Sequence, residues 1–390
     1  MQHARHLVYG LGALCLSAGC SSFDVTSQPA DGGLPDSEGM TGVHDGSVSK
    51  DAEAGSSPHD AHVADVSPGH PSDGSPGDSG GDSGGESGGD ASDATFEAAT
   101  CDGGLCGIET VATGFSQAGV LSVDDANVYV EDQGGTTGTV YQCAKTGCSS
   151  LTTLGPGFAT GIGEDTDNVY WNDFAGGVIV SCKIGGCANS PTVIAPTQPN
   201  AEGLSYDGTN LYWASAGNVL TCLAPSCSSR TTLAVGQSST ITEVASFAGS
   251  AYWLSAGSVL GCSAGGCEQS PTTITSDSAS GSLVVKNGFV YFTSGNSIVS
   301  CPVTSTCAFP HTLGSSYSPF GLGTDGVDIY WLDDEIAQVF RCPVTGCVGS
   351  AEVFADQTSI DPSGETGANV TTDGEYAYWA DATSVFRKHK

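Results

Sequence analysis

Positive charge is scarce in this sequence. It has 10 Lys and Arg residues against 43 Asp and Glu residues, and its formal net charge is −33. Such a chain repels nucleic acid and anionic lipid, so a basic groove for either ligand is excluded. Histidine is also rare, with 8 residues beside 16 cysteines, which is not the composition of a cytosolic metalloprotein. After residue 20 no apolar run approaches the roughly 18 residues of a transmembrane helix.

The N-terminal segment resembles a bacterial export signal. Residues 7–16 form an apolar run that is too short to span a bilayer and is typical of a signal peptide. The small residues before Cys20 resemble the lipobox of bacterial lipoproteins. This resemblance implies that residues 1–19 are removed, that Cys20 carries a lipid anchor to the membrane, and that Ser21 directs the protein to the outer membrane, facing the periplasm or the cell surface. A plain secretory peptide is the alternative.

The segment 20–98, which starts at the lipidated cysteine, is predicted to be a disordered linker. Residues 21–98 include 16 acidic residues but one basic residue, Lys50, and Gly, Ser, Asp and Pro dominate. A segment of this composition cannot bury enough apolar surface to offset the entropy of ordering it. We therefore expect the linker to hold a folded domain, residues 99–390, away from the membrane.

The domain contains a sevenfold repeat with two markers. The first is a Tyr followed by Trp, Phe or Val, and successive tyrosines are 39 to 48 residues apart. These pairs are Tyr129-Val130, Tyr170-Trp171, Tyr212-Trp213, Tyr252-Trp253, Tyr291-Phe292, Tyr330-Trp331 and Tyr378-Trp379. The second marker is a cysteine pair in step with the first: Cys101 with Cys106, Cys143 with Cys148, Cys182 with Cys187, Cys222 with Cys227, Cys262 with Cys267, Cys301 with Cys307 and Cys342 with Cys347. Two markers in phase indicate repeated structural units.

Each unit has the pattern of four short strands. In the third unit the expected strands are residues 203–206, 211–214, 218–222 and 230–234, with turn-forming residues between them. Units of this length with four strands are typical of β-propeller blades. We therefore predict an all-β fold, a seven-bladed β-propeller of four-stranded blades.

The two ends of the domain complement each other. The first unit supplies only a cysteine loop and one strand, residues 108–112, whereas the last unit stops where a cysteine is expected and has Lys388 there. We expect one blade to be built from both chain ends, which closes the ring and removes an open edge.

The aromatic repeat resembles that of the YWTD propellers known from the extracellular domains of lipoprotein receptors. The matching segments are Tyr170-Trp171-Asn172-Asp173, Tyr330-Trp331-Leu332-Asp333 and Tyr378-Trp379-Ala380-Asp381. The motif is a packing motif, so we expect the aromatic side chains in the core between blades. The resemblance implies a binding platform, which is an analogy of fold alone.

The cysteine pairs are predicted to be disulfides. Six of the seven have the spacing Cys-x4-Cys at the turn between the third and fourth strands, and we expect the two residues to lie opposite each other across the hairpin. A glycine precedes the second cysteine in four units, where a positive φ is expected: Gly147, Gly186, Gly266 and Gly346. Zinc knuckles use Cys-x2-Cys, so a metal site and free thiols are the less favoured alternatives.

No catalytic pattern is evident in the domain. It contains two histidines, His311 and His389, and neither a nucleophile elbow nor a phosphate loop. We expect no catalytic residue, no cofactor and no metal. An aspartate lies five residues before the motif tyrosine in five units: Asp124, Asp165, Asp207, Asp325 and Asp373. Turn formation is the favoured interpretation of these aspartates, and Ca²⁺ binding is the alternative.

Three functions remain open. The favoured one is a non-catalytic envelope lipoprotein whose stapled propeller binds a protein or a glycan, but not nucleic acid. A passive coat component is the second. The third is a Ca²⁺-assisted enzyme acting on sugars or lactones, which requires His, Asp or Glu side chains that converge on the axis of the propeller.

Overall fold

The computed structural model describes residues 107–237, 241–356 and 368–390. The predicted signal peptide, Cys20 and the linker lie outside the described residues. Cys101 and Cys106 also lie outside them, so the disulfide between these two cysteines stays a prediction. The proposed domain boundaries stay predictions as well. Within the described ranges the chain has no helix long and apolar enough to span a membrane.

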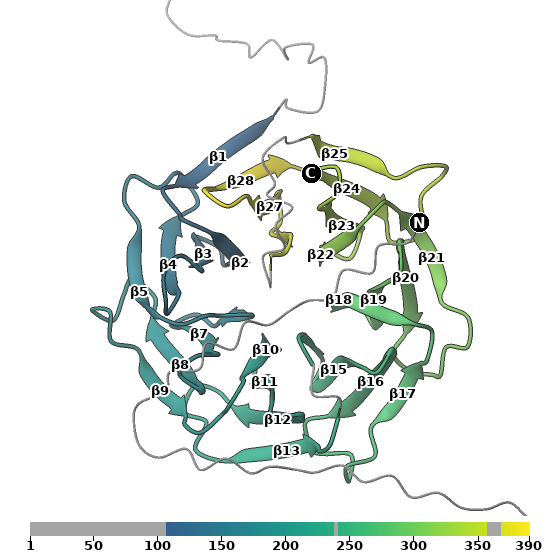
Figure 1. Ribbon diagram of the computed structural model, residues 1–390, viewed down its shortest axis with the longest axis horizontal. Coiled ribbons are helices and arrows are strands. Elements are labelled where there is room, and N and C mark those ends of the chain that lie inside the picture. The colour runs from purple at the N-terminus through teal and green to yellow at the C-terminus, as the bar shows by residue number, and fades with distance from the viewer. Residues whose placement is uncertain (1–106, 238–240, 357–367) are drawn as a thin grey trace, which may run out of the picture. The chain divides into compact units, whose positions relative to one another are not determined.

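The described strands form seven four-stranded antiparallel sheets arranged in a ring (Figure 1). We number these blades along the chain. Blade 1 has β2 (Ala118–Val123), β3 (Asn127–Asp132), β4 (Thr139–Ala144) and β5 (Thr152–Pro156), and blade 2 has β6 (Ile162–Glu164), β7 (Asn168–Asp173), β8 (Val178–Lys183) and β9 (Thr192–Ala195). Blade 3 has β10 (Glu202–Tyr206), β11 (Asn210–Ser215), β12 (Asn218–Leu223) and β13 (Arg230–Ala234), and blade 4 has β14 (Val244–Phe247), β15 (Ser250–Ser255), β16 (Ser258–Ser263) and β17 (Thr272–Thr275).

The remaining blades follow the same order. Blade 5 has β18 (Ala279–Lys286), β19 (Phe289–Ser294), β20 (Ser297–Pro302) and β21 (His311–Ser315), and blade 6 has β22 (Pro319–Thr324), β23 (Asp328–Asp333), β24 (Gln338–Pro343) and β25 (Glu352–Asp356). Blade 7 has β26 (Thr371–Thr372), β27 (Tyr376–Ala380), β28 (Ser384–His389) and β1 (Ile108–Thr113). The predicted seven-bladed propeller is confirmed, and the third repeat has its four strands where the sequence predicted them.

Blade 7 is built from both ends of the chain, as predicted. β1 pairs with β28 in antiparallel register, from Ile108 opposite Lys388 to Thr113 opposite Ser384. Its β28 and β1 therefore lie side by side at the seam of the ring although they are remote in sequence (Figure 1). Because the first and last strands share one sheet, unravelling either end requires the loss of inter-strand hydrogen bonds.

The motif aromatics form the core between blades. The five tryptophans and most of the motif tyrosines are fully buried. Trp171 of blade 2 donates its indole N–H to the Pro156 carbonyl of blade 1, at 3.1 Å. Gly157 makes this close approach possible, since a Cβ there would lie 2.6 Å from the Trp171 indole nitrogen and its φ is +154°. The expected inter-blade packing of the motif is confirmed.

Six of the predicted cysteine pairs form disulfides, with Cα–Cα distances between 5.0 and 5.8 Å. Each joins the two cysteines of one turn in blades 1 to 6: Cys143 with Cys148, Cys182 with Cys187, Cys222 with Cys227, Cys262 with Cys267, Cys301 with Cys307 and Cys342 with Cys347. The disulfide prediction is confirmed at these six pairs.

The expected placement of the two cysteines opposite each other across the hairpin is wrong. Cys222 pairs across the sheet with Arg230 and not with Cys227. Likewise, Cys148 and Cys187 precede the fourth strands of their blades, which begin at Thr152 and Thr192. The second cysteine therefore lies within the turn, because the chain folds back at once after the third strand.

Hydrogen bonds of the turn account for this correction. In blade 2 the Gly186 N–H donates to the Lys183 carbonyl at 2.9 Å, which brings Cys187 back over the end of the third strand. Such a tight reversal needs positive φ, and positive φ at the four predicted glycines is confirmed.

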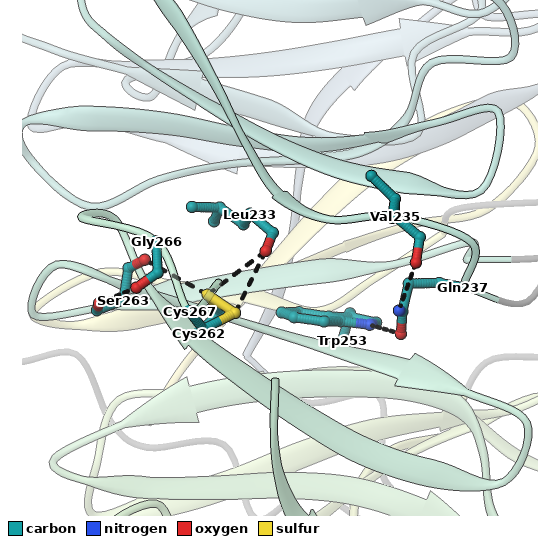
Figure 2. The surroundings of a disulfide bond; sticks show 8 residues. All are labelled: Leu233, Val235, Gln237, Trp253, Cys262, Ser263, Gly266 and Cys267. Atoms are coloured by element: carbon teal, nitrogen blue, oxygen red, sulfur yellow. Dashed lines mark hydrogen bonds between the residues drawn. A yellow bond between two sulfur atoms is a disulfide. The ribbon is translucent and has the colours of Figure 1, made fainter. Parts of the chain in front are cut away.

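The second cysteine also contacts the preceding blade. The backbone N–H of Cys148 donates to the Val111 carbonyl of blade 7 at 3.1 Å, and that of Cys347 donates to the Leu313 carbonyl of blade 5 at 2.8 Å. In blade 4 the sulfur of Cys267 lies 3.3 Å from the Leu233 carbonyl oxygen of blade 3 (Figure 2). The sulfur of Cys187 has the same contact with Leu154 of blade 1, at 3.1 Å. Each of these disulfides thus fixes a turn that holds the outermost strand of its neighbour.

Lys388 provides this contact in blade 7, at the position that a cysteine has in the other blades. Its ammonium donates to the carbonyl of Phe354 in β25 at 2.6 Å. Phe354 occupies the same register position as Leu313, because each is the unpaired residue at the register shift between the third and fourth strands. A cation therefore makes the inter-blade contact that a stapled turn makes elsewhere.

Candidate functional site

The predicted acidic turns are present and share one geometry. In each of the five hairpins, one oxygen of the aspartate accepts the backbone N–H groups of the residues two and three positions later, as at Asp207, where the distances are 2.9 and 2.8 Å. In four blades the other oxygen accepts the hydroxyl of the motif tyrosine, at 2.8 Å between Asp207 and Tyr212 and 2.7 Å between Asp373 and Tyr378. The aspartate thus links the turn to the buried aromatic.

These contacts determine the pKa values of the turn aspartate and of the motif tyrosine. Burial alone would raise the pKa of Asp373, but hydrogen bonds from Lys145, two backbone amides and Tyr378 outweigh it and hold the pKa well below its usual range. Burial and the bond to Asp373 raise the pKa of Tyr378. The aspartate is therefore an ionised turn cap whose oxygens already have protein donors. Among the residues that the structure describes, no group of three or more His, Cys, Asp or Glu side chains is arranged to hold a metal ion.

Lys145 breaks the repeat at the junction of blades 7 and 1. The equivalent position in the turns of blades 2 to 6 is apolar, and its side chain packs against an inter-blade cluster: Ile184, Ala224, Ala264, Val303 and Val344. Lys145 instead places its ammonium 2.6 Å from Asp373, and the two side chains are only 11% and 19% exposed. A buried ion pair replaces the apolar contact here, and it does so again at the junction of blades 6 and 7, where Lys390 occupies the equivalent position with its ammonium 2.7 Å from Asp325.

Arg387 adds a second cation beside Lys145. Its Nε and Nη2 donate to Glu109 Oε2 at 2.8 and 2.6 Å, and its Nη1 donates to the Lys145 carbonyl at 2.8 Å. The guanidinium also lies over the Tyr376 ring, 4.4 Å from its centroid. Charge-assisted hydrogen bonds and the aromatic face together fix this side chain.

A pocket of about 310 Å³ opens at this junction. Lys145, Arg387, Asp373 and Tyr376 line it together with Asp125 and Glu375, which come from the first hairpins of blades 1 and 7. The last two side chains are exposed, and neither carboxylate has a hydrogen-bond or ion-pair partner in the described part of the chain. The pocket therefore has cations in its wall and carboxylates at its mouth.

Two glutamates on the inner strands have raised pKa values. Glu164 accepts the Ser122 hydroxyl of blade 1 at 2.6 Å, and burial raises its pKa to about 7. Glu243, directly before β14, accepts the Leu283 N–H of blade 5 at 2.7 Å, and burial raises its pKa to about 8. Each carboxyl bridges two neighbouring blades, and the two belong to blades 2 and 4, so they do not share a site.

The sequence did not single out the pocket residues. Of these residues only Asp373 was named, as a turn residue. The repeat itself marks Lys145, because the position is apolar in blades 2 to 6 and is a lysine only in blade 1 and, as Lys390, in blade 7. His311 lies away from the pocket, where its Nε2 is 3.3 Å from the Thr345 carbonyl oxygen.

Comparisons with known proteins support the fold and no closer relationship. Neither the scan against protein-family models nor the search of curated proteins found a match. A crystal structure of virginiamycin B lyase from Staphylococcus aureus matches with a TM-score of 0.58 and 11% sequence identity, covering 73% of this chain and 98% of the lyase. A streptogramin B lyase structure matches with a TM-score of 0.56 and 11% identity, covering 72% of this chain and 96% of that one.

A nidogen/laminin complex is more weakly similar, with a TM-score of 0.44, 13% identity and coverage of 56% of this chain and 90% of that one. This likeness is too low to support an inference. The two lyases share the fold with this chain, and at 11% identity the similarity shows nothing further.

Proposed function

We propose that this protein is an exported, lipid-anchored binding module that presents its propeller at the cell envelope and takes a ligand at the junction of blades 7 and 1. The pocket lined by Lys145 carries the proposal. At a position that is apolar in blades 2 to 6, Lys145 places a buried cation beside a cavity, and such convergent polar groups are what ligand sites require.

Six disulfides indicate an oxidising compartment, which supports export. Closing the ring through blade 7 and stapling the outer turns give a rigid scaffold, and rigidity lowers the entropic cost of binding. Lipidation at Cys20 follows from the resemblance to lipoproteins, and the linker would give the propeller reach from the membrane.

No catalysis is proposed. The two structures with the same fold are named as lyases of virginiamycin B and streptogramin B, and fold alone does not transfer an activity. The partner is an envelope or extracellular protein or glycan.

The test uses the full oxidised chain as bait for envelope extract, with two variants. Lys145→Met introduces the apolar character that this position has in blades 2 to 6, and Lys183→Met is the matched control, because Lys183 is an exposed lysine at the end of β8 in blade 2. We expect one dominant component to bind the wild type and the control but not Lys145→Met. Retention by all three proteins would place binding elsewhere, and retention by none would favour the passive coat component.

A further inference from the structure

We propose that the pocket at the junction of blades 7 and 1 takes a zwitterion, namely a free amino acid or the end of a short peptide that carries both a carboxylate and an ammonium group. This inference rests on the proposed binding function and names the chemistry of that same site.

The wall of the pocket offers donors for a carboxylate. The ammonium of Lys145 donates one hydrogen bond, to Asp373 at 2.6 Å, and its other two N–H groups have no oxygen or nitrogen acceptor in the described ranges of the chain. The side chain is only 11% exposed, so water satisfies these donors poorly. Arg387 lies beside it and is joined to it through the Lys145 carbonyl. A ligand carboxylate would complete the bonding of Lys145 next to a second positive charge.

The mouth of the pocket has the opposite character. Asp125 and Glu375 are exposed carboxylates without a partner in the described residues, and they belong to the hairpins that flank the opening. A ligand whose carboxylate reaches Lys145 would extend outward past these two side chains. An ammonium group at that end would pair with them.

Charge decides between the ligand classes. Three carboxylates and two cations line the pocket, and the whole chain has a net charge of −33. A ligand with only negative charge is repelled by this surplus, and a ligand with only positive charge leaves the Lys145 donors unsatisfied. A zwitterion satisfies both groups. The volume of about 310 Å³ suits a single amino acid or a dipeptide, because it lies at the low end of small-molecule sites.

The Tyr376 ring forms part of the wall and is held by the Arg387 guanidinium over its face. An ordered aromatic ring beside the donors provides an apolar surface for the carbon skeleton of the ligand. It loses little side-chain entropy on binding, because Arg387 already fixes it.

The experiment is a calorimetric titration of the full oxidised chain with three probes: the dipeptide glycyl-lysine, its N-acetyl form with the lysine side chain also acetylated, and its C-terminal amide. We expect glycyl-lysine to bind and each blocked form to bind at least about tenfold more weakly, because each loses charge-assisted hydrogen bonds. Equal binding of the three probes would overturn the proposal that the ligand is a zwitterion.

Variants locate the binding. With Lys145→Met we expect glycyl-lysine and its C-terminal amide to bind equally. Glu375 is exposed and lies outside the core, so Glu375→Gln should weaken the binding of glycyl-lysine without affecting the fold. Lys183→Met is expected to change neither. Unchanged binding to Lys145→Met and Glu375→Gln would refute the site.

The outcome separates the two proposals. Suppose that no dipeptide binds, but that the wild type and Lys183→Met retain a component of the envelope extract that Lys145→Met does not. The proposal of a zwitterionic ligand is then wrong and the proposed binding function stands. If no dipeptide binds and no component depends on Lys145, both fail.

Discussion

Glu243 should make this propeller lose stability as the pH rises. Its carboxyl accepts the Leu283 N–H across the blade 4 to blade 5 junction, and burial raises its pKa from 4.5 to about 8. Below pH 4.5 the carboxyl is protonated in both the folded and the unfolded chain. Between pH 4.5 and about 8 the unfolded chain releases the proton and the folded chain keeps it, so the free energy of unfolding falls. Above pH 8 both forms are ionised and the loss is complete.

The size of the effect follows from the pKa difference. One pKa unit corresponds to about 1.4 kcal/mol, so the full difference would cost about 5 kcal/mol between these pH limits. Glu243 retains part of its surface exposed, and screening by water reduces this figure. We expect about 2 kcal/mol. The ionised turn cap Asp373 has a lowered pKa and acts in the opposite sense, since its contribution is lost only as the pH falls into the acid range.

The variant Glu243→Gln isolates this contribution, because the amide keeps an acceptor for Leu283 and cannot ionise. Urea unfolding followed by tryptophan fluorescence, with disulfides intact, should show the variant gaining about 2 kcal/mol relative to wild type between pH 5 and pH 8. The exposed residue Glu268 provides the control Glu268→Gln, whose pH profile should parallel that of wild type. Parallel profiles for Glu243→Gln and wild type would refute the reasoning.

Three further results are expected. Asp207→Ala removes the cap of one hairpin and the partner of a buried tyrosine, and should lower the free energy of unfolding by about 1 to 3 kcal/mol in urea titrations; an unchanged midpoint would contradict its role. The double variant Cys262→Ala and Cys267→Ala opens one stapled turn and should cost about 2 kcal/mol in the same assay, whereas no loss would mean that the turn is fixed by its hydrogen bonds alone. Cys20→Ser should release the protein from membranes into the soluble fraction, as judged by fractionation and by loss of labelled fatty acid; a protein that stays membrane-bound would rule out the anchor.

The sequence alone determined the architecture of the propeller. The Tyr-Trp pairs and the cysteine pairs keep one period, and each unit contains local hairpins whose strands pair with their neighbours in sequence. Because such pairing is local, the number of blades and the turn residues could be predicted. Lys388 stands where the repeat predicts a cysteine, which indicated that the two chain ends share a blade, and the pairing of β1 with β28 confirms this.

Tertiary structure decided what the repeat does not encode. The contact of each stapled turn with the preceding blade depends on how twisted blades pack, and the sequence instead predicted a cysteine facing its partner across the hairpin. Lys145 meets Asp373 across 228 residues of sequence, and Arg387 meets Glu109 across 278. Closing the ring brings these side chains together and forms the pocket. The burial that raises the pKa of Glu243 has the same origin, since β14 and β18 become neighbours only when the blades assemble around a common axis.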